Sequence, residues 1–215
     1  LAFFHTISRK IQFRTVQLLK NRKISTILPA LRLAMNLYSA RGFNVVSIHT
    51  DSEMQPMRDA VLPAQLNVCS TKEHVPEIER SIRTVKERNR GNLHDLPFTI
   101  YPKILIVELI LRCVSWLNAF PSENGISKEL SPREIITGKQ TDFKTECRVE
   151  FGTYCQVHQH NDRTNDDNAR SIDAIALGPT GNRQGTYNFL TLDTWEKISR
   201  NNWTELPMPR RIIDM

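Results

Sequence analysis

The first fifty residues of this chain contain no aspartate or glutamate. The same segment carries eight cations, which are Arg9, Lys10, Arg14, Lys20, Arg22, Lys23, Arg32 and Arg41. A basic segment without acidic residues indicates a polyanionic partner such as nucleic acid, or a solvated basic face on a protein that binds none. Charge alone leaves these two interpretations equally open.

Long hydrophobic runs are also missing. The most apolar segment, residues 104–117, falls short of the roughly 18 residues of a membrane span and contains Glu108 and Arg112. We therefore expect a buried helix there and no membrane partner. The N-terminus lacks the basic region, apolar core and cleavage site of a signal peptide, and Leu1 is not an initiator methionine. We expect a piece cut from a longer protein.

Several chemical motifs are absent too. The four cysteines form no CxxC pair, which argues against a zinc knuckle and fits reduced thiols in an intracellular protein. Ser25 or Ser171 with a distant histidine is conceivable as a hydrolase pair, but no Gly-x-Ser-x-Gly elbow is present. Residues 178–185 lack the Gly-Lys-Ser/Thr of a phosphate loop and are expected to form a hairpin loop. The tryptophans are expected in the core: Trp116, Trp195 and Trp203.

The N-terminal half alternates strand and helix patterns. Residues 2–8 and 11–19 predict a strand pair, and residues 43–48 a fully buried strand that ends at Asp51. Between them, Ser25 or Thr26 is a candidate cap for a helix to about Ala40. Its expected buried positions are Ile27, Leu31, Ala34 and Leu37 or Tyr38. A short helical or irregular stretch (54–62) and a strand (66–70) follow.

Two helices come next, one opened by Pro76 in the first-turn position that proline tolerates, the other spanning 104–120. Ile78, Ile82 and Val85 are the expected buried face of the first. This order resembles an RNase H-like domain that lacks its first strand.

Residues 122–145 are rich in turn residues and predict a linker. Short strands expected at 149–157, 174–177, 187–192 and 198–203 predict a small all-β domain, a barrel or rolled sheet, over 146–215.

Two carboxylates stand where a metal-dependent nuclease or integrase places ligands. Asp51 ends the expected strand, and Glu79 opens the basic helix. Phosphodiester chemistry with two divalent ions needs such acids on rigid elements. Taken singly, each acid is weak evidence, because an aspartate after a strand is commonly a helix cap or turn residue. Glu77 is a rival for the role of Glu79.

The helix also carries a row of cations. Glu79, Arg83, Lys86 and Arg90 lie at i, i+4, i+7 and i+11 and share one face. Three cations next to a carboxylate suit binding of a DNA backbone. Intrahelical pairing of Glu79 with Arg83 explains the pattern equally well.

Three stretches together resemble integrases of copia-type LTR retrotransposons, and the likeness looks closest to elements of algae and diatoms. Residues 74–91 (HVPEIERSIRTVKERNRG) resemble their catalytic helix, and residues 42–54 (GFNVVSIHTDSEM) their strand with the second catalytic aspartate. Residues 116–139 resemble the stretch that ends the core, with its Pro-x-x-Ile-x-x-Gly-Lys pattern. Segments of 149–206 resemble the small β domain that follows.

The resemblance implies an α/β fold: a truncated RNase H-like catalytic core (1–121), a linker (122–145) and a small β domain (146–215). It assigns Asp51 and Glu79 as catalytic metal ligands for Mg²⁺ or Mn²⁺, and Arg83, Lys86 and Arg90 as DNA-binding residues. The spacing from Asp51 to Glu79 is shorter than the family's. The family's first catalytic aspartate and its zinc-binding domain have no counterpart in this chain.

The implied function is DNA binding and metal-dependent phosphoryl transfer in DNA integration, by a Gag-Pol polyprotein fragment that is inactive as this isolated chain. The expected partners are the DNA ends of the element and the target DNA, and a homo-oligomer is expected to form through the core. The expected location is intracellular, and nuclear if the protein acts on chromosomal DNA. The competing interpretation is a remnant of a transposable element that binds DNA or protein without chemistry. A third is self-association through the 104–120 helix.

Overall fold

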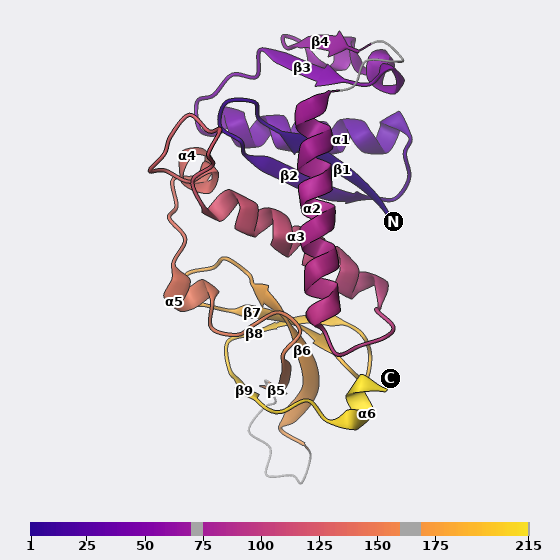
Figure 1. Ribbon diagram of the computed structural model, residues 1–215, viewed down its shortest axis with the longest axis vertical. Helices are drawn as coiled ribbons and strands as arrows, with labels where there is room; N and C mark the ends of the chain where they lie inside the picture. The colour runs from indigo at the N-terminus through magenta and orange to yellow at the C-terminus, as the bar shows by residue number, and fades with distance from the viewer. Residues whose placement is uncertain (70–74, 160–168, 215) are drawn as a thin grey trace. The chain divides into compact units, whose positions relative to one another are not determined.

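The computed structural model describes residues 1–69, 75–159 and 169–214. The chain divides into two compact units (Figure 1). Unit 1 comprises residues 1–90 and 113–140, and unit 2 comprises residues 91–112 and 141–215. The expected domain boundaries (1–121, 122–145 and 146–215) stay a prediction.

Unit 1 begins with a hairpin. β1 (Ala2–Ile7) pairs antiparallel with β2 (Arg14–Leu19), with Phe4 opposite Gln17. The alternating pattern of the sequence predicted this pair. Phe4 is buried, whereas Leu18 on the partner strand is exposed.

A second small sheet in unit 1 is parallel. β3 (Ser47–Thr50) pairs with β4 (Gln65–Val68), and the short helices η1 (Ser52–Met57) and η2 (Asp59–Val61) connect them. The expectation of a fully buried strand over 43–48 is wrong, because Phe43 and Val46 are exposed and the strand begins only at Ser47. Among the described residues β3 pairs only with β4, so it has a neighbouring strand on one side only. A strand at the edge of such a small sheet is less buried than a central strand of a larger parallel sheet. The predicted end of the next strand, Ser70, lies outside the described residues.

α1 (Ile24–Ser39) is the main helix of the N-terminal segment. It buries Ala30, Leu31 and Ala34 in a cluster with Phe4 of β1 and Leu66 of β4. Lys23 occupies the N-cap position without a side-chain capping bond, so neither Ser25 nor Thr26 is the cap. Of the two expected alternatives at the next position, Leu37 is 43% exposed and Tyr38 is partly buried against Ile11 and Phe13.

Three further helices follow: α2 (Pro76–Asp95), α3 (Lys103–Ala119) and α4 (Pro132–Thr137). Pro76 opens α2 as predicted. Its buried residues are Ser81 and Val85, whereas Ile82 is 36% exposed, so the expected Ile78–Ile82–Val85 face is only partly right.

α4 lies within the expected linker. Ser131 and Glu134 cap it reciprocally, and Gly138 ends it with a left-handed φ of 68°. Ile136 of this helix packs in a cluster with Ile11 and Phe13. The segment from 132 to 137 is therefore a packed element of unit 1.

Unit 2 is built on a five-stranded antiparallel sheet in the order β8-β7-β6-β5-β9. The strands are β5 (Tyr154–His158), β6 (Ser171–Pro179), β7 (Tyr187–Thr191), β8 (Lys197–Arg200) and β9 (Trp203–Glu205). β8 and β9 form opposite edges, yet two residues join them. Three residue steps span at most about 10 Å, so the end of β8 lies close to the start of β9 and the sheet is strongly curved. A curved antiparallel sheet is consistent with the barrel or rolled sheet predicted for this region.

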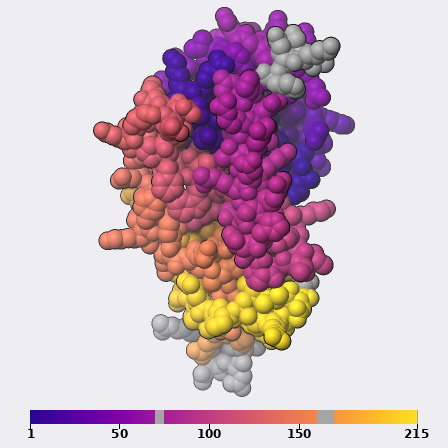
Figure 2. Space-filling view, in the orientation of Figure 1, coloured from indigo at the N-terminus to yellow at the C-terminus, as the bar shows by residue number. Residues whose placement is uncertain are grey.

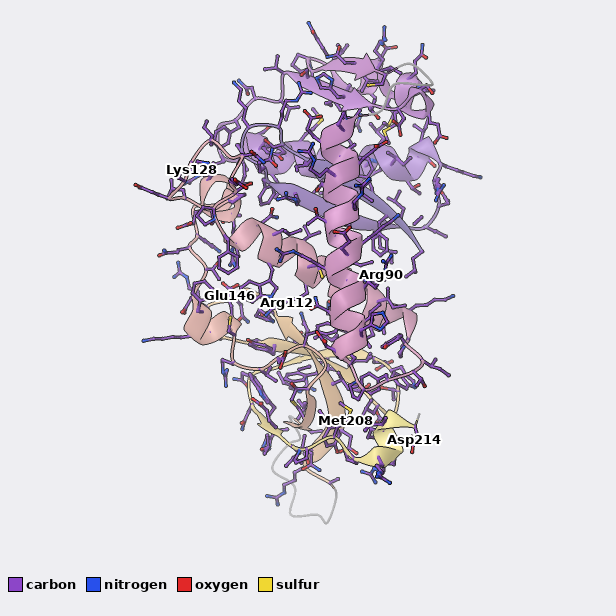
Figure 3. All side chains as sticks on the ribbon, viewed as in Figure 1. Arg90, Arg112, Lys128, Glu146, Met208 and Asp214 are labelled. Atoms are coloured by element: carbon purple, nitrogen blue, oxygen red, sulfur yellow. The ribbon has the colours of Figure 1, made fainter. Side chains whose placement is uncertain are left out.

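The rolled sheet holds two apolar clusters. One contains Cys155, Val157, Tyr187 and Phe189, each 0% exposed. The other packs Leu105 of α3 and Ile212 of α6 (Arg210–Ile213) against Tyr154 and Ile175 of the sheet. α5 (Phe143–Glu146) also belongs to this unit, and the carbonyl of Glu146 accepts a hydrogen bond from Arg112 at 3.4 Å (Figure 3).

The chain is thus a mixed α/β protein with two small sheets and one larger antiparallel sheet. None of the helices among the described residues is both long and apolar enough to cross a bilayer.

Candidate nucleic-acid interface and acidic pair

Asp51 follows directly after β3 with extended backbone (φ −73°, ψ 162°). It occupies the N-cap position of η1, and its backbone carbonyl accepts a hydrogen bond from Met54 at 3.1 Å. Its exposed side chain makes no capping bond. The simplest structural role for an aspartate after a strand, capping of the next helix, is therefore not the role of this carboxylate.

The first turn of α2 supplies two carboxylates, Glu77 and Glu79. Glu77 Oε1 lies 2.9 Å from the guanidinium of Arg9, at the turn between β1 and β2. The pKa of Glu77 is lowered, chiefly by a hydrogen bond from its own backbone N–H and further by Arg9 and His49. This carboxylate is therefore ionised at neutral pH.

The influence of His49 also shows where α2 begins relative to β3. His49 lies on β3 and is close enough to act electrostatically on Glu77. Asp51 is two residues further along extended backbone, so it lies on the same side of the strand as His49. In the view of Figure 1 the first turn of α2 is drawn near β3, and both belong to unit 1. That Asp51 and Glu79 lie together in one metal site stays a prediction.

The choice between Glu77 and Glu79 is a separate matter. Residues two apart on an α-helix point about 200° away from each other. The side of α2 near His49 carries Glu77, while Glu79 is exposed on another side and has interactions of its own. The assignment of Glu79 as the second ligand stays a prediction, and Glu77 is the acid that an ion pair connects to Arg9 in the β1–β2 turn.

The predicted cation row is on the surface of α2. Arg83, Lys86 and Arg90 are all exposed, on a helix that contributes broadly to the face shown in Figure 2. Arg90 is labelled on the same helix in Figure 3. Lysine and arginine side chains are cations at neutral pH. The row is a positive strip that begins beside the acidic first turn.

A buried polar network holds α2 to the hairpin, and the sequence did not reveal it. His5 of β1 contacts the carbonyl of Thr15 through Nδ1 at 2.9 Å and Ser81 Oγ through Nε2 at 2.8 Å. Arg14 Nε donates to the same Ser81 Oγ at 3.1 Å. Asn118 of α3 brackets the backbone of Arg14, accepting from its N–H at 2.9 Å and donating to its carbonyl at 2.7 Å.

The protons of this network can be assigned from chemistry. A carbonyl only accepts, so Nδ1 of His5 carries the proton and the Ser81 hydroxyl donates to Nε2. Burial lowers the pKa of His5 to about 4, with a further contribution from Arg14, and so keeps the ring neutral. Ser81 is 2% exposed and therefore out of reach of a substrate. This serine–histidine contact is structural, and it explains why a serine takes the buried place expected for Ile82.

The donor set for a divalent cation is incomplete. Carboxylate oxygens are the ligands that Mg²⁺ and Mn²⁺ prefer, so Asp51 and Glu79 fit by type. Within residues 1–69, 75–159 and 169–214, however, no group of three or more histidine, cysteine, aspartate or glutamate side chains is placed to hold a metal ion. Two exposed carboxylates alone make a weak site.

Other residues singled out by the sequence are structural. The four cysteines are free thiols, and burial raises the pKa of Cys155 to about 12. The stretch after β6 joins antiparallel neighbours, as a hairpin loop does. Trp203 packs on Tyr187 and Phe189, with the Arg148 guanidinium 4.1 Å from its ring centre. Trp195 is 38% exposed, which corrects its expected place in the core.

Comparison with known proteins adds little. No protein-family model and no curated protein matches the chain. Among solved structures, it is similar to a chain in the cryo-EM structure of the simian T-cell lymphotropic virus intasome in complex with PP2A regulatory subunit B56 gamma. The identity is 12%, the TM-score is 0.44, and the match covers 97% of this chain and 76% of that one. A likeness at this level does not establish a shared fold or function.

Proposed function

We propose that this chain is part of a retroelement integrase of the copia type and that it binds DNA through α2. The observation that carries the proposal is the exposed row of Arg83, Lys86 and Arg90, which follows the acidic first turn of α2 along the same helix. Phosphate groups of a duplex are the ligand that such a strip suits best. If the cations of this strip bind the phosphates of a duplex, the DNA backbone would lie close to the acidic first turn of α2.

The architecture of unit 1 is consistent with this proposal. An antiparallel hairpin, a helix, a parallel strand pair and two long helices follow one another in the order expected of an RNase H-like core without its first strand. α1 packs against residues of both small sheets, Phe4 and Leu66 among them. We propose that unit 1 is such a truncated core and that the small barrel of unit 2 is the domain that follows it.

The catalytic part of the proposal concerns Asp51 and Glu79. Bound Mg²⁺ or Mn²⁺ would supply the electrostatic stabilisation that phosphoryl transfer needs. These two carboxylates would contribute oxygen ligands, and a third carboxylate has to come from outside the described residues. The isolated chain is then a DNA-binding protein without strand-transfer activity. A homo-oligomer and a nuclear location belong to the same proposal.

Fluorescence anisotropy with a labelled 5′-fluorescein duplex tests the DNA-binding claim. The triple variant R83Q/K86Q/R90Q should bind at least about tenfold more weakly, because three phosphate contacts are lost. The control K128Q/K139Q/K144Q removes the same charge from exposed positions outside α2. Equal losses in the two variants would show that only net charge matters, and the proposal for α2 would fail.

A second function is favoured by one observation, the incomplete donor set around Asp51 and Glu79. A remnant that binds DNA without chemistry requires no third ligand. The metal dependence of DNA affinity distinguishes the two functions. A chain that uses a metal site should bind DNA more tightly in Mg²⁺ or Mn²⁺ than in EDTA, and D51N should abolish this increase in affinity. Identical affinity in EDTA and in Mg²⁺ favours the remnant. Parallel tests of E77Q and E79Q decide which glutamate participates.

A further inference from the structure

The outward face of α1 carries an apolar stripe. Pro29, Leu33, Leu37 and Ala40 recur every three or four residues along α1 and its C-cap, and all four are exposed. Leu33 is 57% exposed and Leu37 43%. Because such spacing places side chains one above another on a helix, they form one continuous strip, called the α1 stripe below.

The apolar surface continues beyond the helix. The Phe43 N–H donates to the carbonyl of Tyr38 at 3.0 Å, which folds the chain back onto the last turn of α1. Phe43 is 37% exposed and Val46 72%. Single exposed apolar residues are normal on a protein surface, but a run of them along one helix and its C-terminal loop marks an interaction site.

The opposite face of α1 is already used. Ala30, Leu31 and Ala34 are 5% exposed or less and pack in the core of unit 1. The α1 stripe therefore cannot turn inward without emptying that core. It is available to a second molecule while unit 1 stays folded.

The charged residues of α1 and of the two positions before it are all positive. Arg22 and Lys23 lie just before the helix, Arg32 is next to Leu33, and all three are exposed. The chain has no aspartate or glutamate before Asp51, so its N-terminal segment supplies no carboxylate to balance them. A narrow apolar strip with cations on its borders is complementary to an apolar strip with carboxylates on its borders.

We propose that the α1 stripe binds an acidic amphipathic helix of a partner protein. Its leucines, one helical turn apart, match the seam of a single facing helix, and Arg22, Lys23 and Arg32 meet glutamates that flank that seam. DNA is a poor ligand for the α1 stripe, because its charged phosphates make no apolar contact with the exposed leucines. A membrane surface calls for a wide apolar face with aromatic anchors, whereas α1 exposes only a narrow one.

The test uses the full chain and a synthetic helix-stabilised peptide as long as the 16 residues of α1. The labelled peptide carries leucines at heptad a and d positions and glutamates elsewhere, and a matched peptide has lysines in place of the glutamates. The chain should bind the acidic peptide at least about tenfold more tightly than the basic one. L33S/L37S should lose at least about tenfold in affinity, because two leucines no longer enter the seam.

Two variants control this experiment. L18S/L62S removes two other exposed leucines, 49% and 69% exposed, and should bind like the parent chain. R22E/K23E/R32E should reverse the preference toward the basic peptide. Circular dichroism confirms that each variant is folded.

Three results would overturn the proposal. One is equal binding of both peptides. The second is a dimer by analytical ultracentrifugation that L33S/L37S dissociates while the acidic peptide does not bind, which assigns the α1 stripe to a second copy of the chain. The third is binding to phosphatidylserine vesicles that requires Leu33 and Leu37, without binding of the acidic peptide. None of these results depends on the DNA affinity of α2.

Discussion

Unit 1 and unit 2 solve the problem of a β-sheet's open edges in different ways. Unit 2 pairs five strands in one curved sheet, and its central residues Tyr187, Phe189 and Val157 are fully buried. Unit 1 divides its four strands between two small sheets, and Leu18, Leu33 and Val46 remain exposed. Unpaired edges and exposed apolar side chains are where proteins bind partners. The comparison teaches that the two units differ mainly in how their strands are paired, because unit 2 also exposes apolar side chains, Ile100 and Phe143 among them.

The largest expected effect is in the core of unit 2. Phe189→Ala should lower the free energy of unfolding of unit 2 by about 4 kcal/mol, because a fully buried ring leaves a cavity that the rolled sheet cannot close. Leu31→Ala in unit 1 should cost about 2 to 3 kcal/mol, since a less enclosed site relaxes more easily. Urea unfolding followed by tryptophan fluorescence measures both. An equal or larger loss for Leu31→Ala would contradict the difference between the units.

A pH change should weaken unit 1 alone. The pKa of His5 is about 4 in the folded chain and 6.5 in the unfolded chain, so the unfolded chain binds more protons between these values. Stability from this group is complete above pH 6.5 and is lost as the pH falls toward 4, by at most about 3 kcal/mol.

Hydrogen exchange at pH 7 and pH 4.5, corrected for intrinsic rates, measures this loss. Amides of β1 and β2 should lose protection at the lower pH, and amides of β6 and β7 should lose much less. In His5→Gln the hairpin amides should show a smaller pH dependence. Equal losses in both sheets, or an unchanged dependence in His5→Gln, would show that His5 is not the cause.

The smallest expected effect concerns α4. Ser131 is 1% exposed and its hydroxyl accepts from the Glu134 N–H at 3.2 Å. Ser131→Ala should lower the free energy of unfolding of unit 1 by about 1 kcal/mol, because one N-terminal amide of α4 loses its partner. Ser127→Ala, in the preceding loop, is a comparison with a less buried serine. Thermal unfolding that ranks Ser127→Ala as the more damaging would contradict the assigned cap.

Local patterns anticipated much of this fold. Pro76 marks the start of α2, the alternation of residues 2–19 gives the hairpin, and the short C-terminal strands give the rolled sheet. Asp51 directly follows β3 and Glu79 lies in the first turn of α2, as the sequence predicted. These features depend on proline geometry and on short-range periodicity, which a sequence displays directly.

What the sequence did not show depends on residues far apart in the chain. Ser81 is buried because His5 and Arg14, 76 and 67 positions away, hydrogen-bond to it. Leu37 has the spacing of a buried residue and is nevertheless exposed, because periodicity defines a face of a helix and cannot say what covers it. The link between Glu77, Arg9 and His49 joins three elements for the same reason.

The central claim is that the cations of α2 hold DNA phosphates, and the salt dependence of DNA binding tests it most directly. The slope of log K against log salt concentration reports the number of phosphates neutralised, at about 0.9 per contact on duplex DNA. We predict that R83Q/K86Q/R90Q has a slope shallower than that of the parent chain by about 2 to 3, whereas K128Q/K139Q/K144Q keeps the parent slope. Equal slopes for the parent chain and the α2 variant would contradict the account.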